Sequence, residues 1–473
     1  MPASASRALA ASALWLTACI TSCLTVPPRD RVAVVDATDN EASLVDAATV
    51  DVNALRESAL ADQFLDADEA VRLALLGNAR LIGRLYALDE ARGRLVQAAL
   101  MPNPVAEAEL RFVEGGGGDL FEFGLMQNVV GLFFLPRRKQ IAAARFDATR
   151  AQVLGQVLDA AAEARTAYRA LQAALQREEV AMTATQALEA SFDAARELFE
   201  AGNIIELDML MERTAYEEAK LMLTEARARV LAARENLALL LGARGDADWR
   251  VDPRLPEPTP IDVDPTELEQ RVVEASFDLE QQARELVARG HALGLRRWEA
   301  AFPSGSLGVK GEKEPDDTWL VGPLASFSIP IFDQGQGANL EAQAAFRSAY
   351  AQFTHEALML RRLARERLLH AAALLQRARY LREVVLPLRR AVTHRTQEQF
   401  NAMQIGVFQL LQAKRAEIRT GDEFVRVLFD HYRARIELES LLLGRRPRGD
   451  YGLATFEESA APTMGAGDST NGH

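Results

Sequence analysis

The sequence predicts a mainly α-helical protein with a smaller strand portion, in which a unit of long antiparallel helices and one β-hairpin occurs twice. Three observations support this fold class. Two halves of the chain match each other, two helical patterns run for more than 60 residues, and each half holds a pair of short segments with alternating side chains. The 473 residues are 49% hydrophobic, which is sufficient for a packed structure.

Internal repetition is the strongest of these signals. Four features recur in the same order at offsets of 200 to 202 residues. They are Phe199 in FEAGNI and Phe400 in FNAMQI, Leu239-Leu240-Leu241-Gly242 and Leu441-Leu442-Leu443-Gly444, Pro102 and Pro303, and Phe146 and Phe346. One such match could arise by chance in helices rich in Ala, Leu, Arg and Glu, but four in one order indicate a duplication.

Long helices account for most of each half. Helical patterns are expected at residues 66–101, 137–201, 206–241 and 337–400. We expect turns at residues 131–136 and 330–337, before the two long helices, and a kink at Pro387. Each long helix would measure roughly 95 Å, and two short ones laid end to end would measure roughly 108 Å. These similar lengths favour a wall of antiparallel helices, with a coiled-coil scaffold as the alternative.

The hairpins of the two halves have alternating side chains. In the first half, strands are expected at about 104–113 and 119–130, and in the second half at about 304–313 and 317–329. Small or apolar side chains alternate with charged or polar ones, so one face of each hairpin would contact lipid and the other water. Each segment has about the 9 to 11 residues that cross a bilayer as a tilted strand.

The alternation also assigns individual side chains to a face. Leu110, Phe121, Phe123 and Leu125 are expected on the lipid face, and Glu109 on the water face. No stretch after the N-terminal leader reaches 18 consecutive apolar residues. If the chain crosses a membrane, the sequence therefore predicts that it does so as strands.

The N-terminus is typical of an export signal. Arg7 supplies a positive charge, and residues 8–18 form an apolar run too short to span a bilayer. The run ends in Leu16-Thr17-Ala18-Cys19, which resembles the bacterial lipobox, in which the cysteine is lipidated after cleavage; Cys23 ends a weaker second match. An ordinary secretory signal is the alternative. Because no other cysteine exists, neither disulfides nor a cysteine metal site are expected in the body of the protein.

Composition and motifs argue against several other classes of function. The net charge is −13 with both signs mixed along the chain, so nucleic acid is not an expected partner. The six histidines show neither an HExxH pattern nor i, i+4 pairs, and no metal or other cofactor is expected. No nucleophile motif or phosphate-binding loop occurs, so an enzyme is not expected.

Three motifs in this duplicated chain resemble the TolC-like outer-membrane factor family, that is, the outer membrane efflux proteins, over residues 65–444. They are MPNP at 101–104 before the first strand, FSIPIFDQG at 327–335 after the last strand, and the pattern from Phe199-x-Ala-Gly to Leu207-Asp208 at a helix tip. The resemblance implies a homotrimer, in which each chain gives four strands to one membrane β-barrel that continues as an α-barrel. It also implies a lipid-anchored protein in the cell outer membrane, extending into the periplasm, with a periplasmic adaptor and an inner-membrane pump as partners.

On this basis the chain divides into six segments. They are a signal peptide at 1–18, a lipidated linker at 19–64 with Cys19 or Cys23 as the lipidation site, a first repeat at 65–242, an inter-repeat linker at 243–265, a second repeat at 266–444 and a flexible tail at 445–473.

The resemblance also implies a closable gate at the helix tips. In the family acidic side chains ring this gate; Asp208 matches one such position, whereas Gln409 and Gln412 stand at the corresponding positions of the second repeat. An alternative role for Asp208 is to stabilise the start of its helix through the helix dipole.

The function implied is that of a channel component of a tripartite efflux or secretion system. A periplasmic coiled-coil scaffold lipoprotein without a pore and a type I protein secretion conduit are the alternatives. Metal ions, drugs and proteins all remain open as the substrate.

Overall fold

A computed structural model describes most of the body of the chain. The described residues are 32–35 and 42–45 (backbone only), 64–112, 120–243, 249–260, 263–314 and 318–447. The predicted signal peptide and the candidate lipidation sites Cys19 and Cys23 lie outside them. Two short strands, β1 (Val32–Val35) and β2 (Ala42–Val45), pair with each other in antiparallel fashion.

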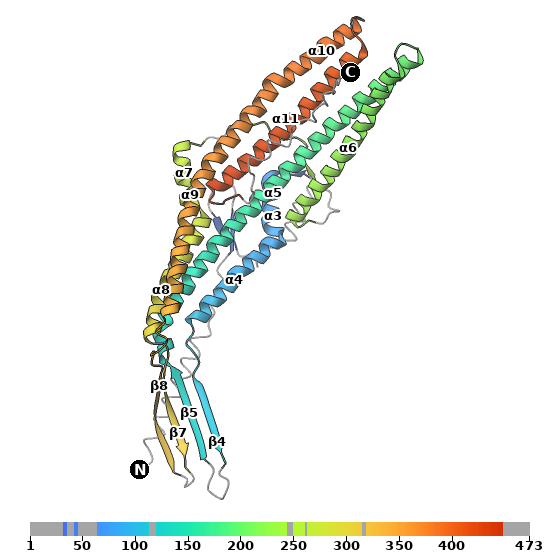
Figure 1. Cartoon of the computed structure of the whole chain (residues 1–473). Coiled ribbons are helices and arrows are strands. Elements are labelled where there is room, and N and C mark those ends of the chain that lie inside the picture. The colour runs from blue at the N-terminus through green and yellow to red at the C-terminus, as the bar shows by residue number, and fades with distance from the viewer. Residues whose placement is uncertain are drawn as a thin grey trace, which may run out of the picture.

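The molecule is elongated, with a β-sheet at one end and two helical hairpin tips at the other (Figure 1). The first repeat contains β3 (Phe64–Leu65), α3 (Ala67–Gly77), α4 (Ala79–Ala99), β4 (Val105–Arg111), β5 (Leu120–Asn128), α5 (Val129–Glu200) and α6 (Glu206–Leu241). After β6 (Arg250–Val251), the second repeat contains α7 (Pro265–Ala275), α8 (Phe277–Ala301), β7 (Gly305–Lys313), β8 (Trp319–Phe327), α9 (Gln336–Tyr380), a π-helical turn (Leu381–Val385), α10 (Leu386–Asn401) and α11 (Val407–Leu442). The two repeats therefore have the same order of elements.

The first helical pattern of each repeat consists of two helices. The single helix expected at 66–101 is wrong, because Asn78 has an extended backbone that ends α3 and starts α4. Its Oδ1 accepts hydrogen bonds from the backbone N–H groups of Arg80 and Leu81, at 3.0 and 3.3 Å. Ser276 separates α7 from α8 in the same way and accepts from Leu279 N–H at 3.2 Å. Asp66 caps α3, because its side chain accepts a 2.7 Å bond from Glu69 N–H.

In each repeat, the end of the first short helix meets the end of the last helix. The end of α3 meets the end of α6 in the first repeat, and the end of α7 meets the end of α11 in the second. Gly242 follows α6 with φ +64°, and a Cβ on it would lie 2.3 Å from the carbonyl oxygen of Gly77. Gly444 follows α11 with φ +93°, and a Cβ there would lie 2.0 Å from the carbonyl oxygen of Ala275. Glycine is required at both positions because the backbones meet without room for a side chain.

The two long helices differ from the prediction at their ends and at the kink. The turn expected at 131–136 is wrong, since α5 already begins at Val129 and includes Pro136. Asn128 caps this helix by accepting a 2.6 Å bond from Gly131 N–H. Pro136 has no backbone N–H, so the helix lacks one backbone hydrogen bond there. Packing of the buried Phe134 against α8 compensates for this loss. In the second repeat, the disturbance expected at Pro387 takes the form of the π-helical turn directly before it.

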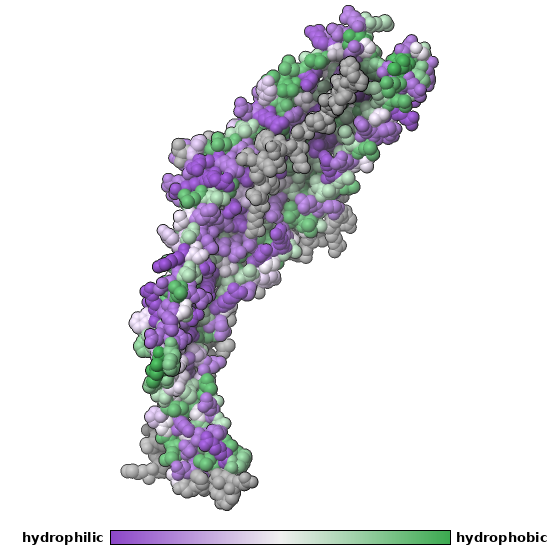
Figure 2. Space-filling view, in the orientation of Figure 1, coloured by the Kyte–Doolittle hydropathy of each residue, from purple (hydrophilic) through white to green (hydrophobic). Residues whose placement is uncertain are grey.

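Two matching cores lie where the helices of each repeat meet. The first includes Leu65, Val71, Tyr168, Leu237, Leu241 and Trp249, and the second includes Leu268, Val272, Leu279, Leu360, Leu438 and Leu441. Tyr168 donates from its hydroxyl to the carbonyl of Leu65 at 2.9 Å, which satisfies its polar end in the first core. Hydrophilic and apolar side chains mix over the long helices (Figure 2). Among the helices of the described part, none is both long and apolar enough to span a bilayer.

Candidate functional site

The two hairpins combine into one four-stranded antiparallel sheet in the order β4-β5-β7-β8. Leu110 pairs with Phe121 and Ala108 with Phe123, and Leu125 pairs with Val309 of the other repeat. Paired residues point to the same side of a sheet, so the register defines an apolar face. Its apolar members are Ala106, Ala108, Leu110, Phe121, Phe123, Leu125, Leu307, Val309, Trp319, Val321, Pro323, Ala325 and Phe327. Gln127 and Lys313, near the ends of their strands, also lie on this face. The expected sharing of a face by Leu110 and Phe123 is confirmed.

Aromatic side chains make the closest contacts on this face. The ring of Trp319 lies 6.4 Å from that of Phe121 and 6.2 Å from that of Phe123, both edge to face. A Cβ on Gly311 would lie 2.2 Å from the Phe123 ring, so this ring covers the glycine on the neighbouring strand. A side chain at Gly311 would therefore have to displace the Phe123 ring.

The opposite face of the sheet carries charges. Glu109, Glu122 and Glu312 form one row across three neighbouring strands. Arg111 pairs with Glu109 and Lys310 with Glu122, each at 2.8 Å, which offsets the repulsion between neighbouring carboxylates. The expected placement of Glu109 on the face opposite Leu110 is confirmed.

Both edges of this sheet are open. All seven residues of β4 are exposed, and β8 has no partner on its outer side within the described part of the chain. A sheet with one apolar and one charged face is not stable in lipid while its edge strands are unpaired, because the N–H and C=O groups at the edges would have no hydrogen-bond partners. Four strands are also too few to close into a barrel alone.

The helix tips at the far end are also built alike. The link from α5 to α6 contains Gly202 at φ +76°, and the link from α10 to α11 contains Met403 at φ +58°, 201 residues later. Asp208 is the third residue of α6, and Gln409 is the third residue of α11. The duplication therefore places Asp208 and Gln409 at equivalent positions, but the chain alone keeps them on two separate tips (Figure 1).

Hydrogen bonding distinguishes the three candidate gate residues. Gln409 Oε1 accepts from the backbone N–H of Gly406 at 2.7 Å, and so contributes to the N-terminal cap of α11. Gln412 is exposed, and Asp208 is half-buried in the first turn of α6. The capping role of Gln409 had not been expected.

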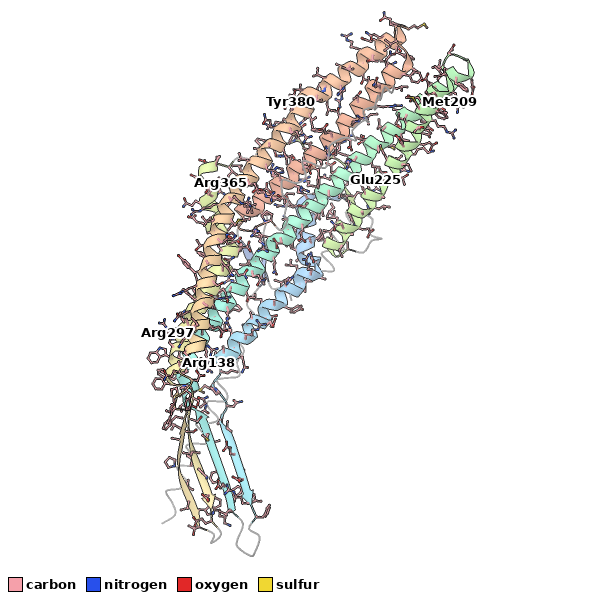
Figure 3. All side chains as sticks on the ribbon, in the orientation of Figure 1. Arg138, Met209, Glu225, Arg297, Arg365 and Tyr380 are labelled. Carbon is pink, nitrogen blue, oxygen red and sulfur yellow. The ribbon has the colours of Figure 1, made fainter. Side chains whose placement is uncertain are left out.

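Ion pairs join the two repeats between the tips and the centre. Arg177 of α5 pairs with Asp422 of α11 through two bonds of 2.7 and 3.2 Å. Nearer the tips, the buried Glu212 accepts hydrogen bonds from both Ser191 and Arg415. A groove of about 780 Å³ lies beside these pairs between α5, α6 and α11. Figure 3 places Glu225, which lines this groove, midway along α6. Sequence reasoning missed these pairs, because their partners lie about 200 or more residues apart.

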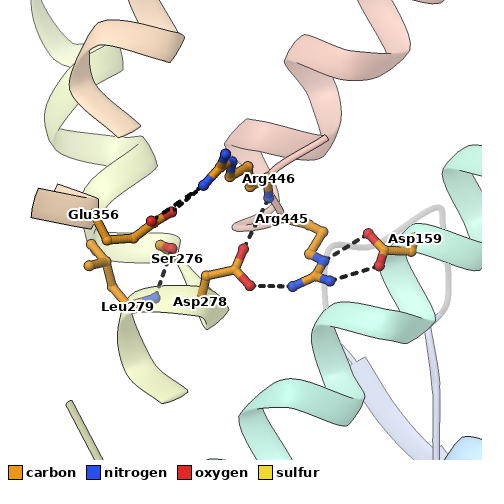
Figure 4. Close-up of polar contacts among 7 residues, drawn as sticks. All are labelled: Asp159, Ser276, Asp278, Leu279, Glu356, Arg445 and Arg446. Carbon is orange, nitrogen blue, oxygen red and sulfur yellow. Dashed lines mark hydrogen bonds and ion pairs between the residues drawn. The ribbon is translucent and has the colours of Figure 1, made fainter. Parts of the chain in front are cut away.

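A second inter-repeat contact surrounds Arg445 (Figure 4). This buried side chain forms two bonds of 2.7 and 2.8 Å with Asp159 of α5, and also bonds to Asp278 of α8. Arg446 donates its backbone N–H to Asp278 at 3.3 Å and pairs with Glu356 of α9 at 3.2 Å. The tail expected from residue 445 therefore does not begin before Pro447; residues 448–473 lie outside the described part.

Burial shifts the pKa values of this cluster. Burial raises the pKa of Asp278 above its ordinary value, although the charge of Arg445 opposes the change. Burial alone would lower the pKa of Arg445, but its hydrogen bonds and the charges of Asp159 and Asp278 raise it overall. The guanidinium therefore stays charged between two carboxylates. Among the described residues, no group of three or more His, Cys, Asp or Glu side chains could hold a metal ion.

Comparisons with known proteins agree with this geometry. Residues 114–243 match the family described as outer membrane efflux protein. The cobalt-zinc-cadmium resistance protein CzcC of Cupriavidus metallidurans is 24% identical over 394 residues, which are 80% of this chain and 90% of that protein.

Solved structures of outer-membrane channels share the fold. The CmeC outer membrane channel of Campylobacter jejuni matches with a TM-score of 0.69 and 14% identity, over 90% of this chain and 95% of CmeC. The outer-membrane channel OprN matches with 0.67 and 20%, over 89% and 99% of the two chains, and CusC with 0.67 and 15%, over 81% and 92%. The fold is thus that of an outer-membrane channel with a helical portion and a strand portion. The family model, the relative and the fold all agree with the resemblance to outer membrane efflux proteins that the motifs indicated.

Proposed function

We propose that this protein is the outer-membrane channel subunit of a tripartite efflux system, which conducts substrate from an inner-membrane pump and a periplasmic adaptor to the exterior. The observation that carries the proposal is the sheet, with one apolar face, one charged face and two open edges, continuous with helices α4, α5, α8 and α9. In a homotrimer, β4 of one copy would pair with β8 of the next. Every strand then has two neighbours, the apolar faces contact lipid and the charged faces line a water-filled passage.

Cations are the substrate class that the charged face favours. Each chain contributes Glu107, Glu109, Glu122 and Glu312 to this face, against Arg111 and Lys310. A ring of excess carboxylates attracts cations into a pore. The relative CzcC is named for resistance to cobalt, zinc and cadmium, which supports divalent metal ions as the cargo. The cargo would pass the charged face without a fixed binding site.

A gate at the helix tips completes the proposed channel. In the trimer, three copies of Asp208 would form a small acidic ring, and Gln409 and Gln412 would hold the neighbouring tips by neutral hydrogen bonds. Such a gate would depend less on pH and divalent ions than an entirely acidic one. The protein would be held in the outer membrane by acyl chains on Cys19, with Cys23 as the alternative site, since several chains anchor firmly.

Conductance of the purified protein in planar bilayers tests the proposal. We expect discrete channel openings, and a reversal potential under a salt gradient that indicates preference for cations. A periplasmic scaffold without a pore would give trimers or coiled coils that bind membranes through the lipid anchor but carry no current. Absence of current from protein shown to be trimeric and inserted would refute the channel function.

A further inference from the structure

Exposed apolar side chains gather where the helices meet the sheet. The most exposed are Phe332, at 92%, and Phe133, at 73%. We call this set the junction collar; its members are Phe133, Trp298, Phe302, Phe327, Ile329, Ile331 and Phe332. Figure 2 shows apolar side chains at this level of the molecule, with hydrophilic ones beside them on the helices. If the sheet crosses the outer membrane, the collar lies at the periplasmic boundary of the bilayer, where aromatic side chains are favoured.

Basic side chains are concentrated directly beyond the collar. The four segments next to the sheet, residues 90–101, 129–146, 290–303 and 330–347, contain nine Arg or Lys and only four Asp or Glu. The whole chain has a net charge of −13, so this excess is local. Arg138 of α5 and Arg297 of α8 lie where the helices approach the sheet (Figure 3).

A pocket between α4 and α5 collects three of these charges. Its volume is about 340 Å³, and its lining includes Arg94, Arg138 and Arg145. The lining also includes the apolar residues Ala91, Ala98, Ile141, Ala142 and Phe146. A pocket of this size with apolar lining residues and several like charges is suited to an anionic, partly apolar ligand.

Carboxylates do not neutralise the pocket. Arg94 pairs with Glu90 one turn away, but both side chains are well exposed, so the pair is weak. Arg138 approaches Glu299 only to 3.9 Å. Arg145 is exposed, and its guanidinium has no ion pair with any residue in the described ranges. At least one full positive charge is therefore left for a ligand.

We propose that this pocket binds the headgroup of an anionic phospholipid in the periplasmic leaflet of the outer membrane. The phosphate lies among Arg94, Arg138 and Arg145, and the acyl chains run along the junction collar into the bilayer. The inference rests on the proposed function, because it requires the sheet to cross the membrane. Lipid is favoured over a free anion because Arg138 of the pocket follows Phe133 of the collar by only five residues on α5, about 8 Å along the helix axis, and one molecule with a headgroup and tails can contact both.

Native mass spectrometry of the purified trimer tests the proposal, with phosphatidylglycerol added at increasing concentration. The test variant is Arg138→Gln with Arg145→Gln. The control is Arg227→Gln with Arg229→Gln, which removes two exposed arginines from α6, far from the sheet. Each basic side chain near an anionic lipid contributes about fivefold in affinity, so the test variant should bind phosphatidylglycerol roughly thirtyfold more weakly than the wild type. The control variant should bind it like the wild type, and phosphatidylethanolamine should bind weakly to all three proteins.

Three results would overturn the inference. Equal lipid retention by the wild type and the test variant would mean that the arginines do not hold the headgroup. Displacement of the lipid by millimolar inorganic phosphate would indicate a site for free anions. A test variant that loses its trimeric state would indicate that the arginines contact a neighbouring subunit. Single-channel current of each variant is recorded in parallel, so that failure of the lipid site in a conducting protein is distinguished from failure of the channel function.

Discussion

Replacing one leucine with arginine should have opposite consequences on the two faces of the sheet. Leu110 on β4 and Leu320 on β8 are matched, because both lie on edge strands and expose 53% and 51% of their surface. Leu110 belongs to the apolar face, whereas Leu320 pairs with Glu312 on the charged face. The pair therefore tests the orientation of the sheet with one kind of substitution.

The expected free-energy cost of each substitution depends on where it places the charge. Leu110→Arg places a charge against lipid, at a cost of about 2 to 4 kcal/mol per chain near the midplane, and every trimer contains three copies. Leu320→Arg places the same charge opposite Glu312, where it should be neutral or stabilising by about 0.2 to 1 kcal/mol. Phe123→Arg should cost more than Leu110→Arg, because it also removes the ring contacts with Trp319 and Phe121, about 1 kcal/mol.

Folding into lipid vesicles measures these differences. The fraction of assembled trimer is followed by electrophoresis without heating, and its stability by urea titration. We expect assembly to fall strongly for Leu110→Arg and Phe123→Arg, but to remain at the wild-type level for Leu320→Arg and for Glu109→Gln. Equal tolerance at Leu110 and Leu320 would refute the reasoning, since it would mean that the apolar face does not meet lipid.

Three further predictions concern the helical portion. Arg445→Met should lower the free energy of unfolding in urea by about 3 to 5 kcal/mol, because it leaves Asp159 and Asp278 without their shared partner. Its control, Arg446→Met, changes the neighbouring residue on the surface and should cost less than about 1 kcal/mol. His431 is fully buried and burial lowers its pKa, so the folded state takes up a proton less readily than the unfolded state. The free energy of unfolding should therefore fall as the pH drops below about 6.5. His431→Leu should weaken this dependence when unfolding is measured between pH 5 and 8. Asp208→Asn should move the reversal potential toward that of a non-selective pore without changing stability, and Gln412→Ala should raise the resting current; no change in either would place the constriction elsewhere. Gln409→Ala is less informative, since it also removes the cap of α11, and Gln409→Glu, which keeps an acceptor for Gly406 N–H, is its control.

The overall architecture was predictable because its signals are local or repeated. Alternation over a few residues was sufficient for the hairpins, and the register confirms that Leu110 and Phe123 share one face of the sheet and that Glu109 lies on the other. The duplication then gave the second hairpin and the second long helix. Both signals depend on side-chain periodicity, which one sequence contains in full.

Features that depend on a partner far along the chain could not be predicted. Asn78 was read as part of a helix, because nothing local distinguishes a capping asparagine from an exposed helical one; its role follows from the way Gly77 meets Gly242. Residues 131–136 were expected to form a turn, but they belong to α5, where Phe134 packs against α8. Arg445 was placed in a mobile tail, since its partners Asp159 and Asp278 lie more than 160 residues away.

The contacts between the two repeats differ in kind from the centre of the molecule to the tips. Near the centre, Arg445 joins both repeats through buried bonds that water does not screen, so this level should behave as one rigid body. Toward the tips the repeats are joined by the part-buried pair of Arg177 and Asp422 beside an open groove, and still nearer the tips by the pair of Arg415 with the buried Glu212. Opening the tips would break these two pairs, and breaking the buried one is costly, but the contacts of Arg445 would stay intact. A channel that opens at one end while its membrane portion stays assembled requires such separate sets of contacts, one near the gate that can break and one at the centre that holds.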